Sequence, residues 1–186
     1  MAFTLLHNIK SKTAEENNIN NFPGVDKDKD PCLTFDFIKN NLSRLHYYCI
    51  NPILEAFGSK DIKILSAYRC MELNKILGGL DNSPHVRGQG IDIISEKYPS
   101  SLLWNWCKQN LPNYHQLIWE YPERGNYHVD KNSFSWVSIS YIANANNRTN
   151  SFSSQKENLH EMYSGEKTTR IGNFTHNIQI AEEKIL

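Results

Sequence analysis

The segment from Ser83 to Asp92 constrains this chain of 186 residues most, because it places a histidine and an aspartate around two glycines. It reads Ser83-Pro-His-Val-Arg-Gly-Gln-Gly-Ile-Asp92. Gly88 and Gly90 allow a turn that brings the imidazole of His85 back beside the carboxylate of Asp92 on the following strand. Both groups ligate zinc, and one aspartate with two histidines suits hydrolytic zinc. The segment therefore predicts two ligands of a metal site, although an isolated His–Asp pair is more often an ordinary surface pair.

The pattern of apolar residues predicts an α+β domain with a small, mainly antiparallel sheet and flanking helices. Apolar residues recur at helical spacing from Phe35 to Phe57, where Pro52 should break or kink the helix and Gly58 should end it. The remaining predicted elements are helices over 71–77 and 99–111 and strands over 62–66, 89–94, 115–120 and 136–141.

Two boundaries follow from the composition along the chain. Residues 1–142 form the predicted domain, within which the polar residues 1–33 are expected to be an N-terminal arm or loop region. Residues 143–186 begin with an Asn/Ser-rich linker and continue as a C-terminal tail whose apolar residues are too sparse for a second core. The tail is therefore expected either to be disordered or to lie along the surface of a partner.

The overall charge excludes some partners. Lys and Arg number 20, as do Asp and Glu, so no global field attracts nucleic acid or anionic lipid. The sequence has no apolar run long enough for a membrane span and no basic-then-apolar signal peptide at its start, which predicts synthesis in the cytoplasm. The four cysteines form no CxxC pair and are expected to be free and mostly buried.

The stretch from Ser66 to Asp92 resembles the zinc D-Ala-D-Ala carboxypeptidase family, which includes phage-type cell-wall endopeptidases. Ser-Ala-Tyr-Arg, Leu-Asn with Gly-Gly, and Ser-Pro-His-Val-Arg-Gly-Gln-Gly-Ile-Asp stand here in the order of the family's motifs, with Gly90 where the family usually has Ala. Gln116-Leu-Ile-Trp-Glu120 and Trp136-Val-Ser-Ile-Ser-Tyr141 continue the likeness. It covers about residues 3–142 and implies that family's hedgehog-like peptidase fold.

The resemblance assigns roles to four residues. His85 and Asp92 match the first two zinc ligands, and Glu120 resembles the acidic residue that acts as general base on zinc-bound water. Arg69 matches the arginine that contacts the carboxylate or carbonyl of the substrate. Two plainer interpretations stay open: Arg69 is a structural ion-pair partner, and Glu120 simply ends a strand in solvent.

Ser138 departs from the family at the position of the third zinc ligand, where a histidine is expected. Strand alternation places Ser138 on the face that this histidine would occupy. A hydroxyl lacks the basic lone pair of imidazole, so zinc would be weakened or absent. His128, on the loop before this strand, is a candidate for a substitute ligand, although the simpler interpretation is that His128 is an ordinary surface histidine.

Three functional hypotheses follow. The first is a degenerate, non-catalytic relative that serves as a structural or assembly component, such as a capsid or tail protein of a phage virion that binds its neighbours through the C-terminal tail. The second is an active zinc peptidase that cleaves the stem peptides of peptidoglycan. The third is a cell-wall recognition module that binds peptidoglycan peptide through Arg69 without hydrolysis.

Overall fold

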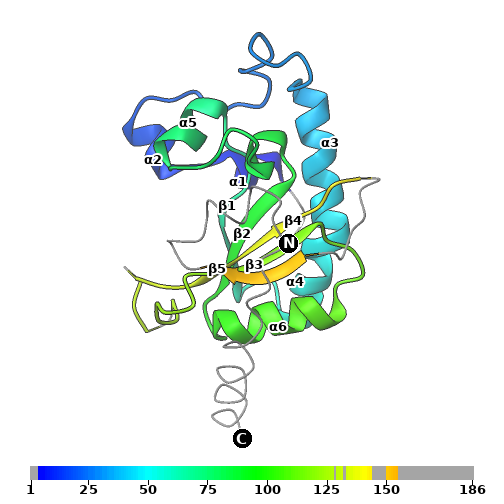
Figure 1. Ribbon diagram of the computed structural model, residues 1–186, viewed down its shortest axis with the longest axis vertical. Helices are drawn as coiled ribbons and strands as arrows, with labels where there is room; N and C mark the ends of the chain where they lie inside the picture. Colours follow the sequence, from blue (N-terminus) through cyan, green and yellow to red (C-terminus); the bar gives the residue numbers. More distant parts are fainter. Residues whose placement is uncertain (1–3, 128, 132, 144–149, 155–186) are drawn as a thin grey trace, which may run out of the picture.

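The computed structural model describes residues 4–127, 129–131, 133–143 and 150–154 and has a single sheet flanked by helices (Figure 1). The strands are β1 (Ile62–Ser66), β2 (Gly90–Ser95), β3 (Gln116–Glu120), β4 (Trp136–Ser140) and β5 (Asn150–Ser154). They lie in the order β1-β2-β4-β3-β5. The first four pair antiparallel, whereas β5 pairs parallel to β3 at one edge of the sheet. The predicted fold class is therefore confirmed.

The helices precede, connect and cover these strands. The α-helices are α1 (Leu5–Ile9), α2 (Lys12–Glu16), α3 (Phe35–Leu45), α4 (Asn51–Phe57), α5 (Met71–Ile76) and α6 (Ser100–Asn110). A π-helical turn, η1 (His46–Ile50), joins α3 to α4, and a 3-10 turn, η2 (Pro84–Arg87), precedes β2. No helix within the residues described reaches the length and apolarity needed to cross a bilayer.

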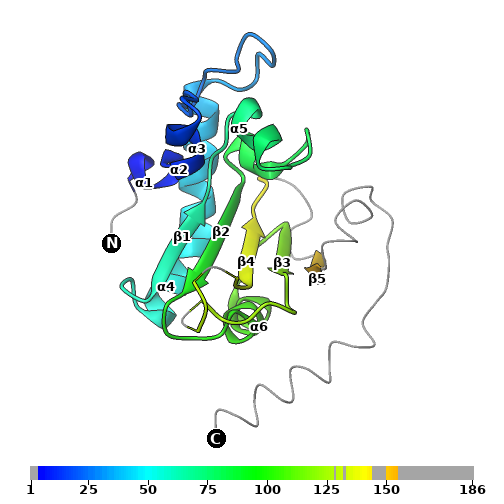
Figure 2. The same cartoon turned by 90° about the vertical axis from the view of Figure 1, so that its left-hand side faces the viewer.

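One face of the sheet builds the hydrophobic core. Residues directly opposite one another on paired strands share a face, so Ile91, Ile139 and Leu117 point the same way. All three are buried, and they join a cluster that includes Leu42 of α3 and Trp104 of α6. In Figure 2 the helices α3 and α4 follow one another along β1 and β2, while α6 lies below β4 and β3. The opposite face of the sheet carries the polar residues of the candidate site.

The long helical run divides where Pro52 was expected to disturb it. Proline has no N–H, and its ring clashes with the carbonyl of the residue four positions earlier. The chain widens into η1, in which the N–H of Asn51 bonds to the carbonyl of His46, and Pro52 then lies in the first turn of α4. Gly58 ends α4 with φ of +87°, as predicted.

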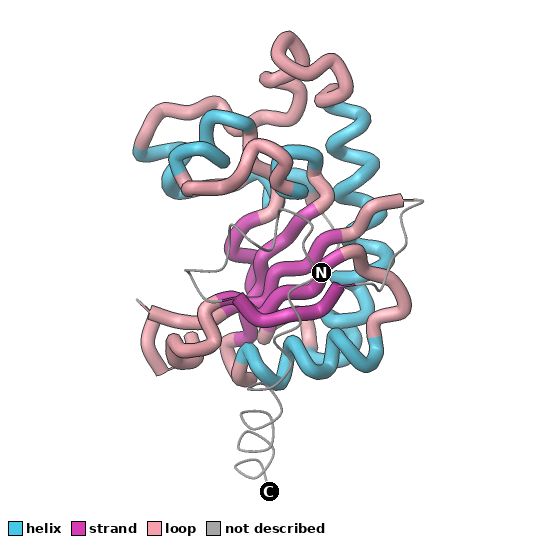
Figure 3. Tube along the Cα trace, in the orientation of Figure 1, coloured by secondary structure: helices cyan, strands magenta, loops and turns pink. Residues whose placement is uncertain are grey.

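The N-terminal residues differ from the expected arm. Two short helices, α1 and α2, lie within residues 1–33, and the side chains of Asn21 and Asp26 are buried against the start of α5. Asn21 and Asp26 bond to backbone groups more than 40 positions away, and hydrophobic periodicity carries no signal for such contacts. The tube in Figure 3 shows these helices and their loops beside α5, above the sheet. At the other end, β5 comes from the region that was expected to be only a linker.

Candidate active site

Asp92 on β2 lies directly opposite Ser138 on β4 in an antiparallel register. The two side chains therefore share the polar face of the sheet. The hydroxyl of Ser138 forms a hydrogen bond to the Asp92 carboxylate. Ile118 of β3 stands opposite Ser138 on its other side, so Ser138 lies in the middle of the sheet.

His85 enters the site from η2, the turn that precedes β2. Its side chain is buried, and Nδ1 lies 2.6 Å from the carbonyl of Ala67. Because a carbonyl only accepts, Nδ1 carries a proton and donates it, and Nε2 faces Asp92 Oδ1 at 3.4 Å. When Nε2 is also protonated, the charged ring faces the carboxylate as a donor, and a metal ion would take the place of that proton. Two donor atoms bound to one tetrahedral zinc ion lie about 3.4 Å apart, since each bond is about 2.1 Å long. The His85–Asp92 pair thus has the separation of two zinc ligands, and the bond to Ala67 orients the ring as a supporting contact would.

Two glycines let the turn and the strand meet. Gly88 ends η2 in the left-handed region with φ of +66°, and a Cβ there would lie 2.8 Å from the carbonyl oxygen of Ile38. A Cβ on Gly90 would lie 3.1 Å from the backbone nitrogen of His85. Gly88 therefore lets η2 end close to α3, and Gly90 lets β2 pass close to η2, so the turn that the spacing predicted depends on both positions.

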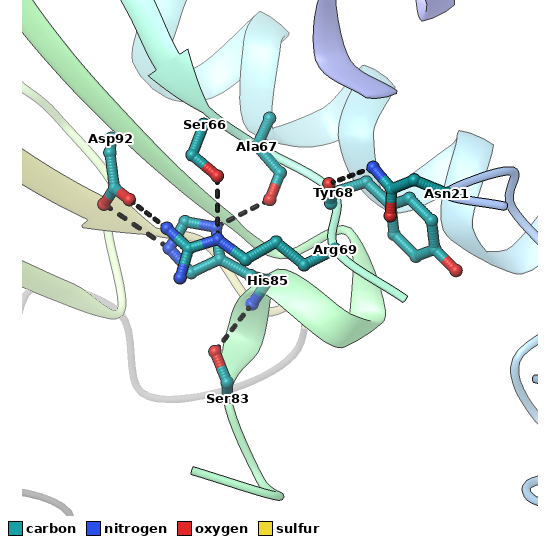
Figure 4. A network of polar contacts seen from close by, with 8 residues as sticks. All are labelled: Asn21, Ser66, Ala67, Tyr68, Arg69, Ser83, His85 and Asp92. Atoms are coloured by element: carbon teal, nitrogen blue, oxygen red, sulfur yellow. Dashed lines mark hydrogen bonds and ion pairs between the residues drawn. The ribbon is translucent and has the colours of Figure 1, made fainter. Parts of the chain in front are cut away.

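Arg69 is engaged inside the site. Its Nη2 donates to Asp92 Oδ2 at 2.5 Å and its Nε donates to Ser66 Oγ at 2.7 Å. Figure 4 shows the guanidinium and the imidazole of His85 converging on the carboxylate of Asp92. Arg69 therefore forms the structural ion pair that was one of its two interpretations, and its partner Asp92 is also one of the two predicted metal ligands.

The Asp92 carboxylate is stabilised in its charged form. Burial alone would raise its pKa, but the charges of His85 and Arg69 and the hydrogen bonds from His85 and Ser138 outweigh it. The pKa of Asp92 consequently lies well below its usual range. The charged carboxylate of Asp92 can therefore bind a cation, either a metal ion or a guanidinium.

Glu120 ends β3 on the same face. It pairs with Trp136, two residues before Ser138 on β4, so Glu120 is a diagonal neighbour of Ser138. Its exposed fraction is only 6%, which excludes the interpretation of Glu120 as a strand end in open solvent. The fold thus brings His85, Asp92, Ser138 and Glu120 to one face.

The protein-family model described as Peptidase M15 matches residues 27–130, which is more than half of the chain. The chain belongs to the peptidase M15 family. No curated protein matches it. The matched range includes His85, Asp92 and Glu120 and ends before the strand that carries Ser138.

The residues of this M15 site fit a zinc ion only in part. His85 and Asp92 provide two donors at a suitable separation. Among the residues that the structure describes, no group of three His, Cys, Asp or Glu side chains is placed to hold a metal. The substitute proposed from sequence, His128, lies outside the described residues.

The contacts that fix the backbone beside Arg69 were not predicted from the sequence. Asn21 bonds to the backbone on both sides of Arg69, and Asp26 accepts the N–H of Met71 at 2.7 Å. Asn21 lies in residues 1–33, which were expected to be an arm or loop region, and it was assigned no role. A buried asparagine within a polar segment has no periodic signature, so only the tertiary structure could reveal it.

Proposed function

We propose that this M15 domain is a non-catalytic component that has kept the scaffold and lost the hydrolytic zinc centre. The observation that carries the proposal is the cross-strand pair of Asp92 and Ser138. A strand neighbour of a zinc-ligating aspartate is well placed to provide the third ligand, and here it is a hydroxyl. At neutral pH a serine hydroxyl is a far poorer zinc ligand than imidazole.

The contacts of Asp92 support the same proposal. Arg69 already neutralises Oδ2, and its positive charge lies beside the space that a dication would enter. Like charges at such distances repel, the more strongly where burial limits screening. With Ser138 as hydrogen-bond donor, the carboxylate has protein partners that reduce its need for a metal.

Zinc affinity tests this proposal directly. Competition with a chromogenic chelator would compare the native chain with Ser138→His and with Ser138→Ala as the matched control. We expect Ser138→His to bind zinc at least about 100-fold more tightly, since it adds a third ligand, and Ser138→Ala to remain as weak as the native chain. Tight, stoichiometric zinc in the native chain would overturn the proposal.

The alternative is an active zinc peptidase of peptidoglycan stem peptides. It is favoured by the 3.4 Å separation of His85 Nε2 and Asp92 Oδ1 and by the burial of Glu120 on the same face. In that case His128 would supply the third ligand and Glu120 would hold the proton of the attacking water. Zinc that is lost in His128→Ala, together with hydrolysis of a stem peptide that is lost in Glu120→Gln, would establish this alternative.

Within the non-catalytic proposal, two roles differ in the partner. One is assembly in a phage capsid or tail, with the Asn/Ser-rich tail after residue 142 binding neighbouring subunits; its support is the composition of that tail. Neighbouring genes for virion proteins would support this role, and an isolated monomer with a protease-sensitive tail would contradict it. The other is recognition of a peptidoglycan peptide through Arg69, which a loss of peptide binding in Arg69→Met would support.

A further inference from the structure

The backbone around Arg69 is fixed by four consecutive N–H groups that each have a partner from elsewhere in the chain. Tyr68 donates to the carbonyl of Asn8, and Arg69 donates to the carbonyl of His85. The next two N–H groups are satisfied by side chains of the N-terminal segment, Asn21 for Cys70 and Asp26 for Met71. The segment that carries Arg69 is thus attached to the rest of the molecule at each residue from 68 to 71.

Asn21 contributes on both sides of Arg69. Its Nδ2 donates to the carbonyl of Tyr68 at 3.2 Å, and its Oδ1 accepts the N–H of Cys70 at 2.7 Å. The same Nδ2 donates to the carbonyl of Ile9 at 2.8 Å, which fixes the amide from the N-terminal side. Figure 4 shows the bond to Tyr68, one residue from the arginine whose guanidinium reaches Asp92. One buried amide therefore spans the peptide groups that flank Arg69.

The consequence for the site is orientation. Arginine has a long side chain with several rotatable bonds, so a fixed guanidinium requires a fixed backbone and fixed acceptors. Ser66 and Asp92 are the acceptors; Ser66 ends β1 and pairs directly with Asp92 of β2. Asn21 adds to the constraint on the backbone of Arg69 by bonding to the peptide groups on both of its sides.

We infer that Asn21 is a positioning residue of the M15 site, acting through Arg69 on the Asp92 carboxylate. The side chain of Asn21 bonds to the backbone of Ile9, Tyr68 and Cys70, so its effect on the site must pass through the peptide groups of Tyr68 and Cys70. It would hold Arg69 whether the domain hydrolyses peptide, binds it or only assembles. A negative result with the Asn21 variants would therefore not bear on the proposed function.

The test measures the hydrogen bond of Arg69 itself in the full-length, isotope-labelled chain. The Nε–H of Arg69 donates to Ser66, and its exchange with water can be followed by NMR. In Asn21→Ala we expect this exchange to accelerate about tenfold or more, since the backbone of Arg69 gains freedom. A general loss of stability would instead accelerate exchange at many sites equally.

Asn74→Ala is the matched control. Asn74 is also buried, and its Nδ2 donates to the carbonyl of Leu80 at 2.8 Å, away from the two peptide groups that flank Arg69. We expect exchange at Arg69 to change less than about twofold in Asn74→Ala, measured at matched global stability. Equal acceleration in the two variants, or none in Asn21→Ala, would overturn the inference.

Asn21→Ser keeps the test decisive if Asn21→Ala does not fold. The serine keeps a small polar group at this position without a buried charge, but it is too short to bond to both Tyr68 and Cys70. We expect an acceleration at Arg69 that is confined to this residue and its neighbours. Unchanged exchange in Asn21→Ser would then be the result that contradicts the positioning role.

Discussion

Arg69 and Asp92 form an ion pair in which Nη2 lies 2.5 Å from Oδ2 and both side chains are largely removed from water, with exposed fractions of 15% and 9%. Removing one partner of such a buried pair leaves the other partner without solvent, which does not happen in an exposed ion pair. Removing the arginine takes away one of the charges that lower the pKa of Asp92, so the variant must either bury an uncompensated carboxylate or protonate it. The pair is therefore part of the fold as well as of the site.

Replacing Arg69 by methionine should destabilise the protein strongly. Methionine keeps the length of the side chain and removes the charge, so we expect the free energy of unfolding to fall by about 3 to 5 kcal/mol. Urea unfolding measures this change. The control is Arg87→Met, because Arg87 pairs with Asp30 at 2.9 Å with exposed fractions of 42% and 22%. That variant should lose no more than about 1 kcal/mol, and equal losses would contradict the distinction.

Gly88→Ala should disrupt the turn that carries His85. An alanine there would combine a left-handed backbone, at φ of +66°, with a Cβ only 2.8 Å from the carbonyl oxygen of Ile38. We expect a loss of about 2 to 4 kcal/mol in the free energy of unfolding. Gly78 separates the two causes, since its φ is +74° and a Cβ would meet no atom within 4 Å. Gly78→Ala should cost about 1 kcal/mol, and an equally large loss would show that steric contact at Gly88 is unimportant.

The sequence predicted those parts of the site that depend on local spacing. Strand alternation has a period of two, so the position of Ser138 on the polar face followed from the strand alone, and its pairing with Asp92 agrees. The glycines between His85 and Asp92 predicted a turn, and η2 is that turn. These features need only nearby residues, which is why the pattern was sufficient.

The features that were missed depend on distant partners. Asn21 bonds to Tyr68 and Cys70 across 47 and 49 positions, and no local pattern distinguishes it from its polar neighbours. The role of Arg69 stayed open between a substrate contact and an ion pair, because its acceptor is 23 positions away on another strand. Strand β5 has a composition typical of a linker and is recognised only by its pairing with β3.

The four cysteines should differ sharply in reactivity. Cys32 is exposed, whereas Cys49, Cys70 and Cys107 are buried and all four are free. Burial raises the pKa of Cys49 to about 12 and also raises that of Cys70 and Cys107, so these thiols lack the reactive thiolate. A colorimetric disulfide reagent at pH 8 should modify one thiol rapidly and the other three only after unfolding. Cys32→Ser should abolish the rapid phase, and a second fast thiol would contradict the burial of the others.

Stability should fall as the pH is lowered through the range in which His46 titrates. The side chain is 5% exposed, its Nε2 donates to Asn8 Oδ1 at 2.8 Å, and burial lowers its pKa to about 4. An unfolded histidine has a pKa of about 6.5, so between these values the unfolded chain takes up a proton that the native chain refuses. The contribution of His46 to the free energy of unfolding is therefore fully present above pH 6.5. It falls by about 3 kcal/mol as the pH is lowered towards 4 and does not change further below that pH.

His46→Gln keeps a donor for Asn8 without titrating, so the difference in unfolding free energy between this variant and the native chain should shrink or reverse from pH 7 to pH 4. Parallel pH profiles for the two proteins would show that His46 has the same pKa in the native and the unfolded chain, which would contradict the effect of burial.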